Sequence, residues 1–399
     1  MAVPIGAVAV SARSLAPDLA RGAMLLLIAL ANAHLYLYGR PIGVRGYPIP
    51  ESIADRVVVL LQMTFVDGRA YPMFAFLFGY GIVQLVRRHT SMGVDEAAVR
   101  TLVRRRGAWM VVFGFLHALL LFSGDIIGAY GLLAVLLAGL LIRASDRKLL
   151  ILVGGWTVPI MAFGALGGLP QPDGSESFLP SMSVTDPLVA AGFRVIEWLG
   201  LTVVISVFSL VPAVALGVWA ARRRLLDEPE RHRPLLVRVA VAGIGAAVVL
   251  GLPLALMAAQ IWTSPPLELI MLFGALHALG GYAGGMGYAA LFGLLAIRLA
   301  RRGSPGPATY ALQACGQRSL SCYLAQSVAF VALLPAWTFG LGEGAHVWQT
   351  ALYAVGTWLV ILLIAAASAR AGYRGPAELL LRRLTYGPRR TAPTATSAG

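Results

Sequence analysis

The sequence predicts an all-α fold, a polytopic membrane bundle of about 10 transmembrane helices. Hydrophobic residues make up 58% of the chain and charged residues only 13%, and the mean hydropathy is +0.77. Soluble domains carry roughly 25% charged residues, so this composition is typical of a membrane protein. Apolar segments of about 20 residues, the length that crosses a bilayer as a helix, recur along the chain.

Ten such segments account for most of the chain. They lie near residues 20–38, 70–87, 107–123, 125–142, 149–168, 197–220, 237–261, 268–297, 310–335 and 347–369. The eighth holds about 30 residues, or about 45 Å of helix at 1.5 Å per residue, so we expect it to tilt, break or project beyond the bilayer. Its glycine cluster, HALGGYAGGMGYAA, is the expected break.

A shorter apolar run precedes the second segment, in IADRVVVLLQMTFVDGRAYP. It is too short to cross a bilayer. It ends at Asp67, Gly68 and Arg69, and the two charged side chains are costly to place in hydrocarbon. We therefore expect an interfacial or re-entrant helix before the second transmembrane helix.

The formal net charge of +14 follows the pattern of membrane topology. Basic residues gather after every second apolar segment, whereas the longest intervening loop, LPQPDGSESFLPSMSVTDP, carries only acidic charges. The positive-inside rule places the basic loops and both termini in the cytoplasm, and we expect no nucleic-acid partner. The first loop departs from the alternation, because Arg40, Arg45, Arg56 and Arg69 are only partly offset by acidic residues.

The chain divides most clearly at the charged stretch RRRLLDEPERHRP. We expect six transmembrane helices over residues 1–222, a cytoplasmic linker loop over 223–236 and a C-terminal transmembrane region over 237–390. The polar tail 391–399 is expected to be disordered. No strong internal repeat is visible, which disfavours a transporter built from symmetric halves.

Three residues fit packing better than chemistry. Cys315 and Cys322 form neither a disulfide framework nor a set of metal ligands, and we expect no metal site. His277 lies beside glycines at positions 280, 281, 284 and 285, whose small-xxx-small spacing lets another backbone approach closely.

Two ionisable residues, His117 and Asp125, stand out in GAWMVVFGFLHALLLFSGDIIGAYGLLAVLL. Charging either group in hydrocarbon costs several kcal/mol, so such residues are usually inward-facing and functional. They fall in neighbouring antiparallel segments, where a carboxylate can orient an imidazole. The alternatives are that His117 hydrogen-bonds a neighbouring helix and that Asp125 caps the helix that follows Ser123 and Gly124.

Four stretches of the chain resemble a known family. They are FAFLFGYGIVQLVRR, RRRGAWMVVFGFLHALLLFSGDIIGAYGLL, GQRSLSCYLAQS and YRGPAELLLRRLTYG. In this order and spacing they are similar to the successive motifs of the DUF418 (YeiB-like) family of bacterial inner-membrane proteins. The resemblance covers nearly the whole chain, and it implies a multi-pass protein of the bacterial cytoplasmic membrane.

The first segment adds a remoter resemblance. Asp18 and Arg21, followed by Asn32, are similar to the opening of transmembrane acyltransferases of the acyltransferase-3 and heparan-α-glucosaminide N-acetyltransferase type. Acyltransferase-3 proteins carry a histidine where this chain has Asn32, whereas the glucosaminide enzyme carries an asparagine with its histidine further on. An amide can orient a substrate but cannot act as a general base. The resemblance therefore implies that His34 or His117 supplies the base.

Acyl transfer would give roles to further residues. A cytoplasmic acyl-coenzyme A would place its phosphates among inner arginines, and its thioester near an imidazole that deprotonates a hydroxyl or amine acceptor. Arg21, Arg104, Arg105 and Arg106 are the candidates for binding the phosphates. The same arginines also fit topology signals, and Arg21 fits a snorkelling interface anchor.

The start of the ninth segment is polar. Gln317, Arg318, Tyr323 and Gln326 lie there, and helical spacing brings positions 313, 317 and 320–324 toward one face. Such a face lines water or substrate more often than lipid. We therefore interpret these residues as a candidate substrate site.

A short helix is expected near the C-terminus. Pro376 fits its start, Glu378 its first turn, and Arg382 a partner for Glu378 four residues later. We expect this amphipathic helix to lie on the inner leaflet.

Three classes of function fit these observations. An acyltransferase with acyl-coenzyme A as co-substrate and a small-molecule or glycan acceptor fits best. A small-molecule transporter would couple transport to protonation of His117 or Asp125. A non-catalytic membrane scaffold would require neither residue.

Overall fold

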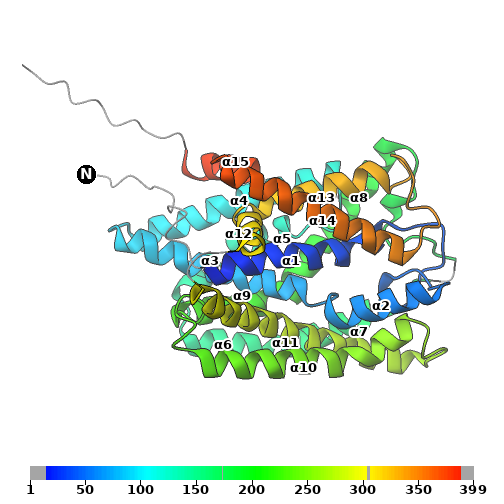
Figure 1. Ribbon diagram of the computed structural model, residues 1–399, viewed down its shortest axis with the longest axis horizontal. Helices are drawn as coiled ribbons and strands as arrows, with labels where there is room; N and C mark the ends of the chain where they lie inside the picture. The colour runs from blue at the N-terminus through cyan, green and yellow to red at the C-terminus, as the bar shows by residue number, and fades with distance from the viewer. Residues whose placement is uncertain (1–14, 173, 303–305, 388–399) are drawn as a thin grey trace, which may run out of the picture.

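The computed structural model describes residues 15–172, 174–302 and 306–387. Across these ranges the protein is all-helical, and paired extended backbone is confined to three isolated bridges between loop residues. The predicted all-α class is therefore confirmed. Figure 1 shows most of the helices side by side along the longest axis of the molecule.

The helices follow one another closely along the chain. They are α1 (Leu15–Ala33), α2 (Ile53–Phe65), α3 (Ala70–Ser91), α4 (Glu96–Leu120), α5 (Ile127–Arg143), α6 (Asp146–Gly155), α7 (Thr157–Gly167), α8 (Pro187–Val204), α9 (Val211–Arg222), α10 (Arg233–Ala258), α11 (Leu267–Ala300), α12 (Pro307–Gln317), α13 (Ser319–Leu333), α14 (Val347–Arg370) and α15 (Pro376–Tyr386). A π-helical turn, Ile205–Leu210, joins α8 to α9.

Six of the described helical segments are long and apolar enough to cross a membrane. They are Leu15–Tyr36, Asp146–Gly167, Pro187–Val204, Arg233–Ala258, Leu267–Ala300 and Val347–Arg370. Three shorter apolar helices, Ile127–Arg143, Phe208–Arg222 and Ser319–Leu333, accompany them. These segments support a multi-pass membrane protein, whereas the expected count of about ten crossings is not confirmed.

Two of the expected spans are interrupted along their length. The span expected over 149–168 contains a turn at Trp156, between α6 and α7. The span expected over 197–220 contains Pro212, which lacks the N–H that an α-helix requires. The turn that precedes this proline is π-helical, a local rearrangement that accommodates the missing donor.

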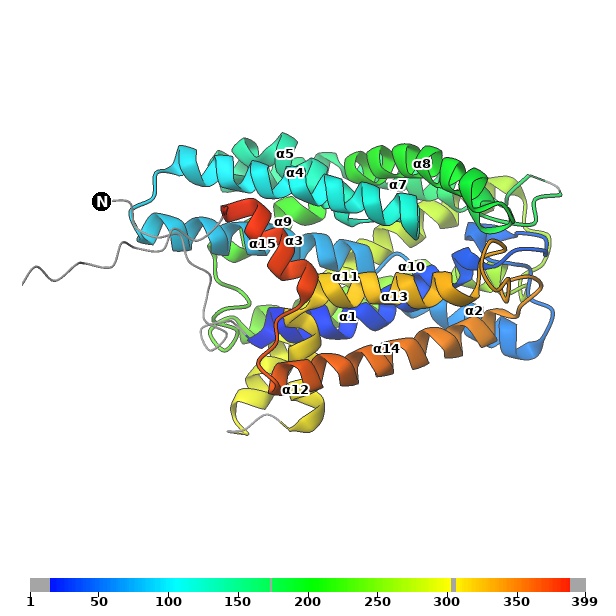
Figure 2. The ribbon, with the colours of Figure 1, turned by 90° about the horizontal axis from the view of Figure 1, so that it is seen from above.

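The expected ninth span is also two helices. Arg318, with φ −115° and ψ 26°, departs from helical geometry between α12 and α13. Cys315 and Cys322 lie on either side of this break and are buried in the apolar core. Positions 313 and 317 therefore do not share one continuous helical face with 320–324, because α12 and α13 point in different directions (Figure 2).

The expected break in the eighth span is wrong as well. α11 is one continuous helix of 34 residues, about 51 Å long at 1.5 Å per residue, so it extends beyond a hydrocarbon core of about 30 Å. Its glycines allow close contact instead. A Cβ on Gly281 would lie 2.4 Å from the carbonyl oxygen of Gly68, so the connection between α2 and α3 can approach α11 only because Gly281 has no side chain.

α2 is the short helix that was expected before the second transmembrane helix. Ser52 caps it by accepting a hydrogen bond from the Asp55 N–H at 3.0 Å. Val59 and Met63 are buried on one side, and the Met63 carbonyl oxygen lies 3.1 Å from the ring of His277 in α11. Apolar residues spaced by four are exposed on the other side, at Ile53, Val57, Leu61 and Phe65. α2 therefore ends inside the bundle, next to the start of α3.

The loops separate onto two ends of the bundle. We call one of them the basic end, and it comprises residues 87–106, 143–148, 222–233, 298–302 and 370–383. Its loops contact one another through ion pairs, for example between Arg222 and Asp146 at 3.0 Å. At the opposite end, Tyr38 forms isolated bridges with Ser177 and Glu343. The alternation of charge along the sequence thus corresponds to two separate ends in space.

Arg56 is exposed, whereas the other three arginines that depart from this alternation are paired or buried. Arg40 pairs with Glu51 at 3.2 Å, and Arg45 pairs with Asp67 at 2.9 Å. Arg69 is fully buried against α10 and α11. Since their charges are satisfied within the protein, they do not indicate the side of the membrane on which the first loop lies.

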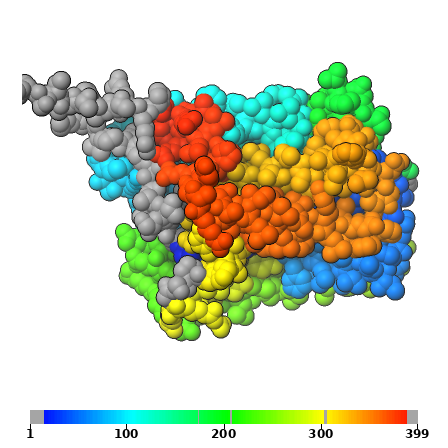
Figure 3. Space-filling model, turned by 45° about the horizontal axis from the view of Figure 1, so that its top comes forward, coloured from blue at the N-terminus to red at the C-terminus, as the bar shows by residue number. Residues whose placement is uncertain are grey.

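α15 packs on the bundle rather than lying apart from it. Its Glu378 carboxylate accepts hydrogen bonds from the N–H of Leu320 at 2.8 Å and from the hydroxyl of Ser321 at 2.5 Å. Glu378 thus caps α13, and Leu381 is buried against the protein. Figure 3 shows α15 beside α13 and α14 on one face. The expected tail, 391–399, lies outside the described residues.

The crossing of α3 and α9 provides a test of this packing. A Cβ on Gly79 would lie 2.1 Å from the carbonyl oxygen of Val214, and one on Gly217 would lie 2.0 Å from that of Phe76. Gly79→Val should therefore lower the free energy of unfolding in detergent by about 1–3 kcal/mol, as overpacking does elsewhere. Gly245→Val in α10, where nothing lies within 4 Å of an added Cβ, is the matched control. Equal thermal stability of the two variants would contradict the contact.

Candidate functional site

His117 is held by hydrogen bonds at both ring nitrogens. Its Nδ1 lies 3.0 Å from Oδ1 of Asp125, and its Nε2 lies 2.8 Å from the hydroxyl oxygen of Ser327. The three residues are only 3%, 0% and 4% exposed, in that order. When Asp125 is ionised and the imidazole neutral, Nδ1 donates to Asp125 and Nε2 accepts the Ser327 hydroxyl proton.

Local backbone geometry brings His117 and Asp125 together. α4 ends three residues after His117, whose carbonyl oxygen accepts the N–H groups of Leu121 and Phe122. A Cβ on Gly114 would lie 2.3 Å from Oδ2 of Asp125. Because Gly114 has no side chain, the carboxylate can pack directly against α4.

The second carboxylate oxygen of Asp125 is also satisfied. Oδ2 accepts the N–H of Gly128 at 2.6 Å, and the indole N–H of Trp198 lies 3.4 Å away. The helix cap considered for Asp125 is therefore present together with the contact to His117. One oxygen fixes the start of α5 while the other orients the imidazole, so the ring cannot easily turn away.

Ser327 could not be identified from the sequence. It lies 210 residues beyond His117, on α13, and nothing in its local pattern links it to α4. The sequence feature that could have pointed to Ser327 is its position one helical turn after Tyr323, a residue that the sequence analysis places on a polar face. Only the packing of α13 within the bundle shows that the serine meets the histidine.

A cavity of about 1810 Å³ opens at the basic end and reaches into the bundle. Its mouth is rich in arginine. The arginines are Arg21, Arg87, Arg88, Arg106, Arg224, Arg231, Arg301, Arg318, Arg374 and Arg382, and the acidic residues are Asp18, Asp227, Glu228, Glu230 and Glu378. With twice as many arginines as carboxylates, the lining favours a polyanionic ligand.

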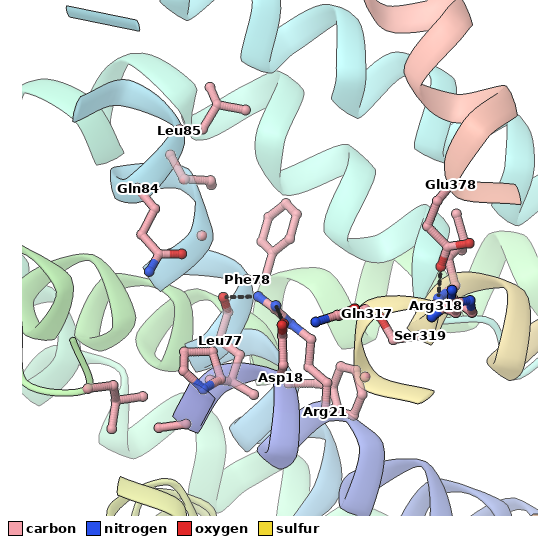
Figure 4. A pocket seen from close by; sticks show the side chains of 18 of the residues that line it. Asp18, Arg21, Leu77, Phe78, Gln84, Leu85, Gln317, Arg318, Ser319 and Glu378 are labelled. Atoms are coloured by element: carbon pink, nitrogen blue, oxygen red, sulfur yellow. Dashed lines mark hydrogen bonds and ion pairs between the residues drawn. The ribbon is translucent and has the colours of Figure 1, made fainter. Parts of the chain in front are cut away.

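The walls of the cavity come from distant parts of the chain. Figure 4 shows Asp18 and Arg21 of α1, Leu77 of α3 and Gln317 of α12 near one another. Arg21 pairs with Asp18 at 3.5 Å and donates to the carbonyl oxygen of Leu77 at 3.4 Å. Deeper walls are apolar, and they include Leu25, Ile28, Met110 and Ile127. The cavity thus combines a charged mouth with an apolar interior.

Tyr323 separates this cavity from His117. It lines the cavity, it is itself 5% exposed, and its ring centroid lies 5.1 Å from that of His117. His117, Asp125 and Ser327 are outside the described lining. A molecule that enters from the basic end therefore meets Tyr323 before the histidine.

The four arginines predicted to bind phosphates divide into two pairs. Arg21 and Arg106 line the cavity. Arg104 and Arg105 are exposed on α4 and fall outside its described lining. Geometry thus separates neighbours that the sequence pattern could not distinguish.

The remaining candidate residues also differ in position. Gln317 and Arg318 line the cavity beside Tyr323. Gln326 is buried deeper, where its amide donates to a carbonyl oxygen of α1 at 2.9 Å. Asn32 is partly buried in the last turn of α1.

His34 belongs to a different group, which we call the interior cluster. The interior cluster consists of His34, Arg45, Asp67, Arg69 and His277. It surrounds the break between α2 and α3, with Nη1 of Arg69 2.7 Å from Nε2 of His277. His34 stacks on Tyr47 with ring centroids 3.8 Å apart. The imidazole expected to be mainly structural, His277, thus contacts a buried guanidinium.

These features define a class, a helical multi-pass membrane protein with a buried Asp–His–Ser cluster behind an arginine-lined cavity. Residues 220–388 match the family model described as "Protein of unknown function (DUF418)", which confirms the resemblance to DUF418 over this part of the chain. The chain is also similar to the uncharacterized protein YxaH of Bacillus subtilis (strain 168). The two are 25% identical over 402 residues, which cover 92% of this chain and 93% of YxaH.

The position of Tyr323 can be tested by thiol accessibility. In a background with Cys315→Ala and Cys322→Ala, His117→Cys should react slowly with a small methanethiosulfonate reagent in detergent. Adding Tyr323→Ala should accelerate the reaction several-fold, because it opens the wall between the cavity and position 117. Tyr282→Ala, which removes a tyrosine that packs on Tyr71 elsewhere, should leave the slow rate unchanged. Equal rates with and without Tyr323 would rule out this barrier.

Proposed function

We propose that this protein is a membrane acyltransferase, which moves an acyl group from an acyl-coenzyme A to a hydroxyl or amine acceptor. The observation that carries this proposal is the oriented pair of His117 and Asp125, buried directly behind the inner wall of an arginine-lined cavity. An imidazole held in this way can take the proton of an attacking group. The resemblance of Asp18, Arg21 and Asn32 to the opening of transmembrane acyltransferases supports the same chemistry.

The cavity suits a long donor with one polyanionic end. Arginine side chains at the mouth offer paired N–H donors to phosphate oxygens, and Arg21 and Arg106 are the predicted phosphate ligands that lie there. The apolar interior suits a pantetheine arm and an acyl chain. The volume of about 1810 Å³ exceeds the roughly 300–1,000 Å³ of typical small-molecule sites, which leaves room for such a donor. Gln317 and Tyr323 would contact it along the path.

The proposed sidedness rests on the same arrangement. The basic end carries the arginine-rich loops, and the positive-inside rule assigns such loops to the cytoplasm. The donor would then enter from the cytoplasm, and both termini would lie on that side of the bacterial inner membrane. Broken and shorter helices would complete the ten crossings, since α6 with α7 and α8 with α9 each run in sequence through the bundle.

One observation favours a second candidate, a small-molecule transporter. The interior cluster places charged groups at a break between two consecutive helices, α2 and α3. Transporters commonly bind substrates and coupling ions at such discontinuous helices. Protonation of Asp67, rather than of Asp125, would then be the step to test for coupling to substrate transport.

The acyltransferase proposal is tested by thiol release from acetyl- and octanoyl-coenzyme A. His117→Ala should slow release by about 100-fold or more, the usual range for loss of a general base. Asp125→Asn should also slow it, because an amide can hold the imidazole in the wrong tautomer. His277→Ala is the control, and it should lower thermal stability while retaining the rate per folded molecule.

Two results would count against acyl transfer. One is a wild-type protein that releases no thiol from either donor, and the other is a His117→Ala variant with the wild-type rate. Substrate uptake driven by a proton gradient and lost in Asp67→Asn would instead support the transporter. If neither His117→Ala nor Asp67→Asn changed the result of any assay, the non-catalytic membrane scaffold would be the remaining hypothesis.

The proposed sidedness is tested by cysteine labelling in the same cysteine-free background. Ser183→Cys lies at the end opposite the basic end, and Thr101→Cys lies at the basic end, and both positions are exposed. An impermeant maleimide should label the first in intact cells and the second only after permeabilisation. The reverse pattern would overturn the cytoplasmic entry of the donor.

A further inference from the structure

The buried serine beside His117 has no role in simple general-base catalysis. A base acting directly on the acceptor needs an imidazole and an orienting carboxylate, and both are present without Ser327. Yet the Ser327 hydroxyl lies 2.8 Å from Nε2, on the side of the ring opposite Asp125. We infer that Ser327 is a nucleophile that carries the acyl group as an ester between donor and acceptor. This inference rests on the proposed acyltransferase function.

The hydrogen-bond order matches the requirement for activating a hydroxyl. A serine attacks efficiently when an imidazole takes its proton, and the imidazole does so when a carboxylate holds its other nitrogen. Here the order is Asp125 Oδ1, His117 Nδ1, His117 Nε2 and Ser327 Oγ, with contacts of 3.0 and 2.8 Å. The three residues come from the loop before α5, from α4 and from α13, so the order arises from tertiary packing.

Ser327 is also within reach of the cavity. It lies four residues after Tyr323 on α13, and residues four apart lie on the same side of a helix. Tyr323 forms part of the cavity wall. A thioester that passes the Tyr323 ring would therefore approach Ser327 and His117 together.

A second buried hydroxyl lies next to the serine. Tyr36 is 0% exposed and is held between the rings of Phe122 and Phe330, with centroids 4.7 and 5.4 Å away. Its hydroxyl neighbours Ser327 and makes no hydrogen bond of good geometry within the described residues. A fixed donor of this kind can stabilise the negative oxygen that forms when Ser327 attacks a carbonyl.

The reaction then has two halves. In the first, Ser327 Oγ attacks the thioester carbonyl carbon, His117 Nε2 takes the hydroxyl proton, and the carbon–sulfur bond breaks. The coenzyme A thiolate takes that proton and leaves as the thiol. In the second, His117 takes a proton from the acceptor hydroxyl or amine, the acceptor attacks the ester carbonyl, and Ser327 Oγ leaves and regains the proton.

The experiment looks for the ester directly. The purified full-length protein is incubated with acetyl- or octanoyl-coenzyme A without acceptor, quenched in acid and digested, and the α13 peptide is analysed by mass spectrometry. We expect an acyl group on Ser327 in the wild type and none in Ser327→Ala. Thiol release should fall by about 100-fold or more in Ser327→Ala. Ser327→Cys should carry the acyl group as a thioester that hydroxylamine removes.

Two further variants separate nucleophile from packing. Ser209→Ala removes another buried serine, in the π-helical turn, and should retain both the acyl group and the rate. Tyr36→Phe should slow acylation by at least about 10-fold, because it removes the proposed oxyanion donor. Melting temperatures of all variants show whether a lost signal reflects unfolding, and Ser327→Cys keeps the test decisive if Ser327→Ala does not fold.

Different results would overturn the acyltransferase proposal and the assignment of Ser327 as nucleophile. Thiol release that depends on His117 but persists in Ser327→Ala, with no acyl group on the wild-type peptide, would overturn the nucleophile and leave the acyltransferase intact. No thiol release by the wild type would overturn both. Acylation at a residue other than Ser327 would also refute the assignment.

Discussion

A polar group inside a membrane-embedded bundle is stabilised by a partner within the protein, because lipid offers none. This constraint determines which helices meet. Asp125 and Ser327 satisfy both nitrogens of His117, and Asp67 neutralises Arg45. The contact of His117 with Ser327 joins residues 210 positions apart, and that of Arg45 with Asp67 joins residues 22 positions apart. Apolar surfaces alone would not specify these partners, since lipid tails and leucine side chains are equally apolar.

The same helices approach closely because glycines face backbone carbonyls. A Cβ on Gly316 would lie 1.8 Å from the carbonyl oxygen of Asp18, and one on Gly131 would lie 2.6 Å from that of Gly107. These contacts set the spacing of α1 to α12 and of α4 to α5. The polar partners can therefore be short side chains, and a hydroxyl as small as that of Ser327 can reach a ring on another helix. The positions of the glycines and the pairing of the polar side chains therefore depend on each other.

The sequence predicted the helical class, the short helix before α3 and the proximity of His117 and Asp125, because each depends on local pattern or on the cost of burying charge. It could not show where helices break. Arg318 interrupts a segment that the sequence pattern predicts as one helix, and the continuous α11 contains a glycine cluster that the pattern predicts as a break. Ser327 was missed for a different reason, since its partner lies 210 residues away and only tertiary structure brings them together.

The cap that Glu378 forms on α13 links the end of the described chain to the centre of the molecule. Glu378 accepts from the first N–H groups of α13, and Ser327 lies seven residues further along the same helix, about 10 Å away at 1.5 Å per residue. An α-helix transmits displacement along its axis with little compression. α15 therefore contacts the start of the helix that carries Ser327, so the position of Ser327 beside His117 depends on where α15 packs.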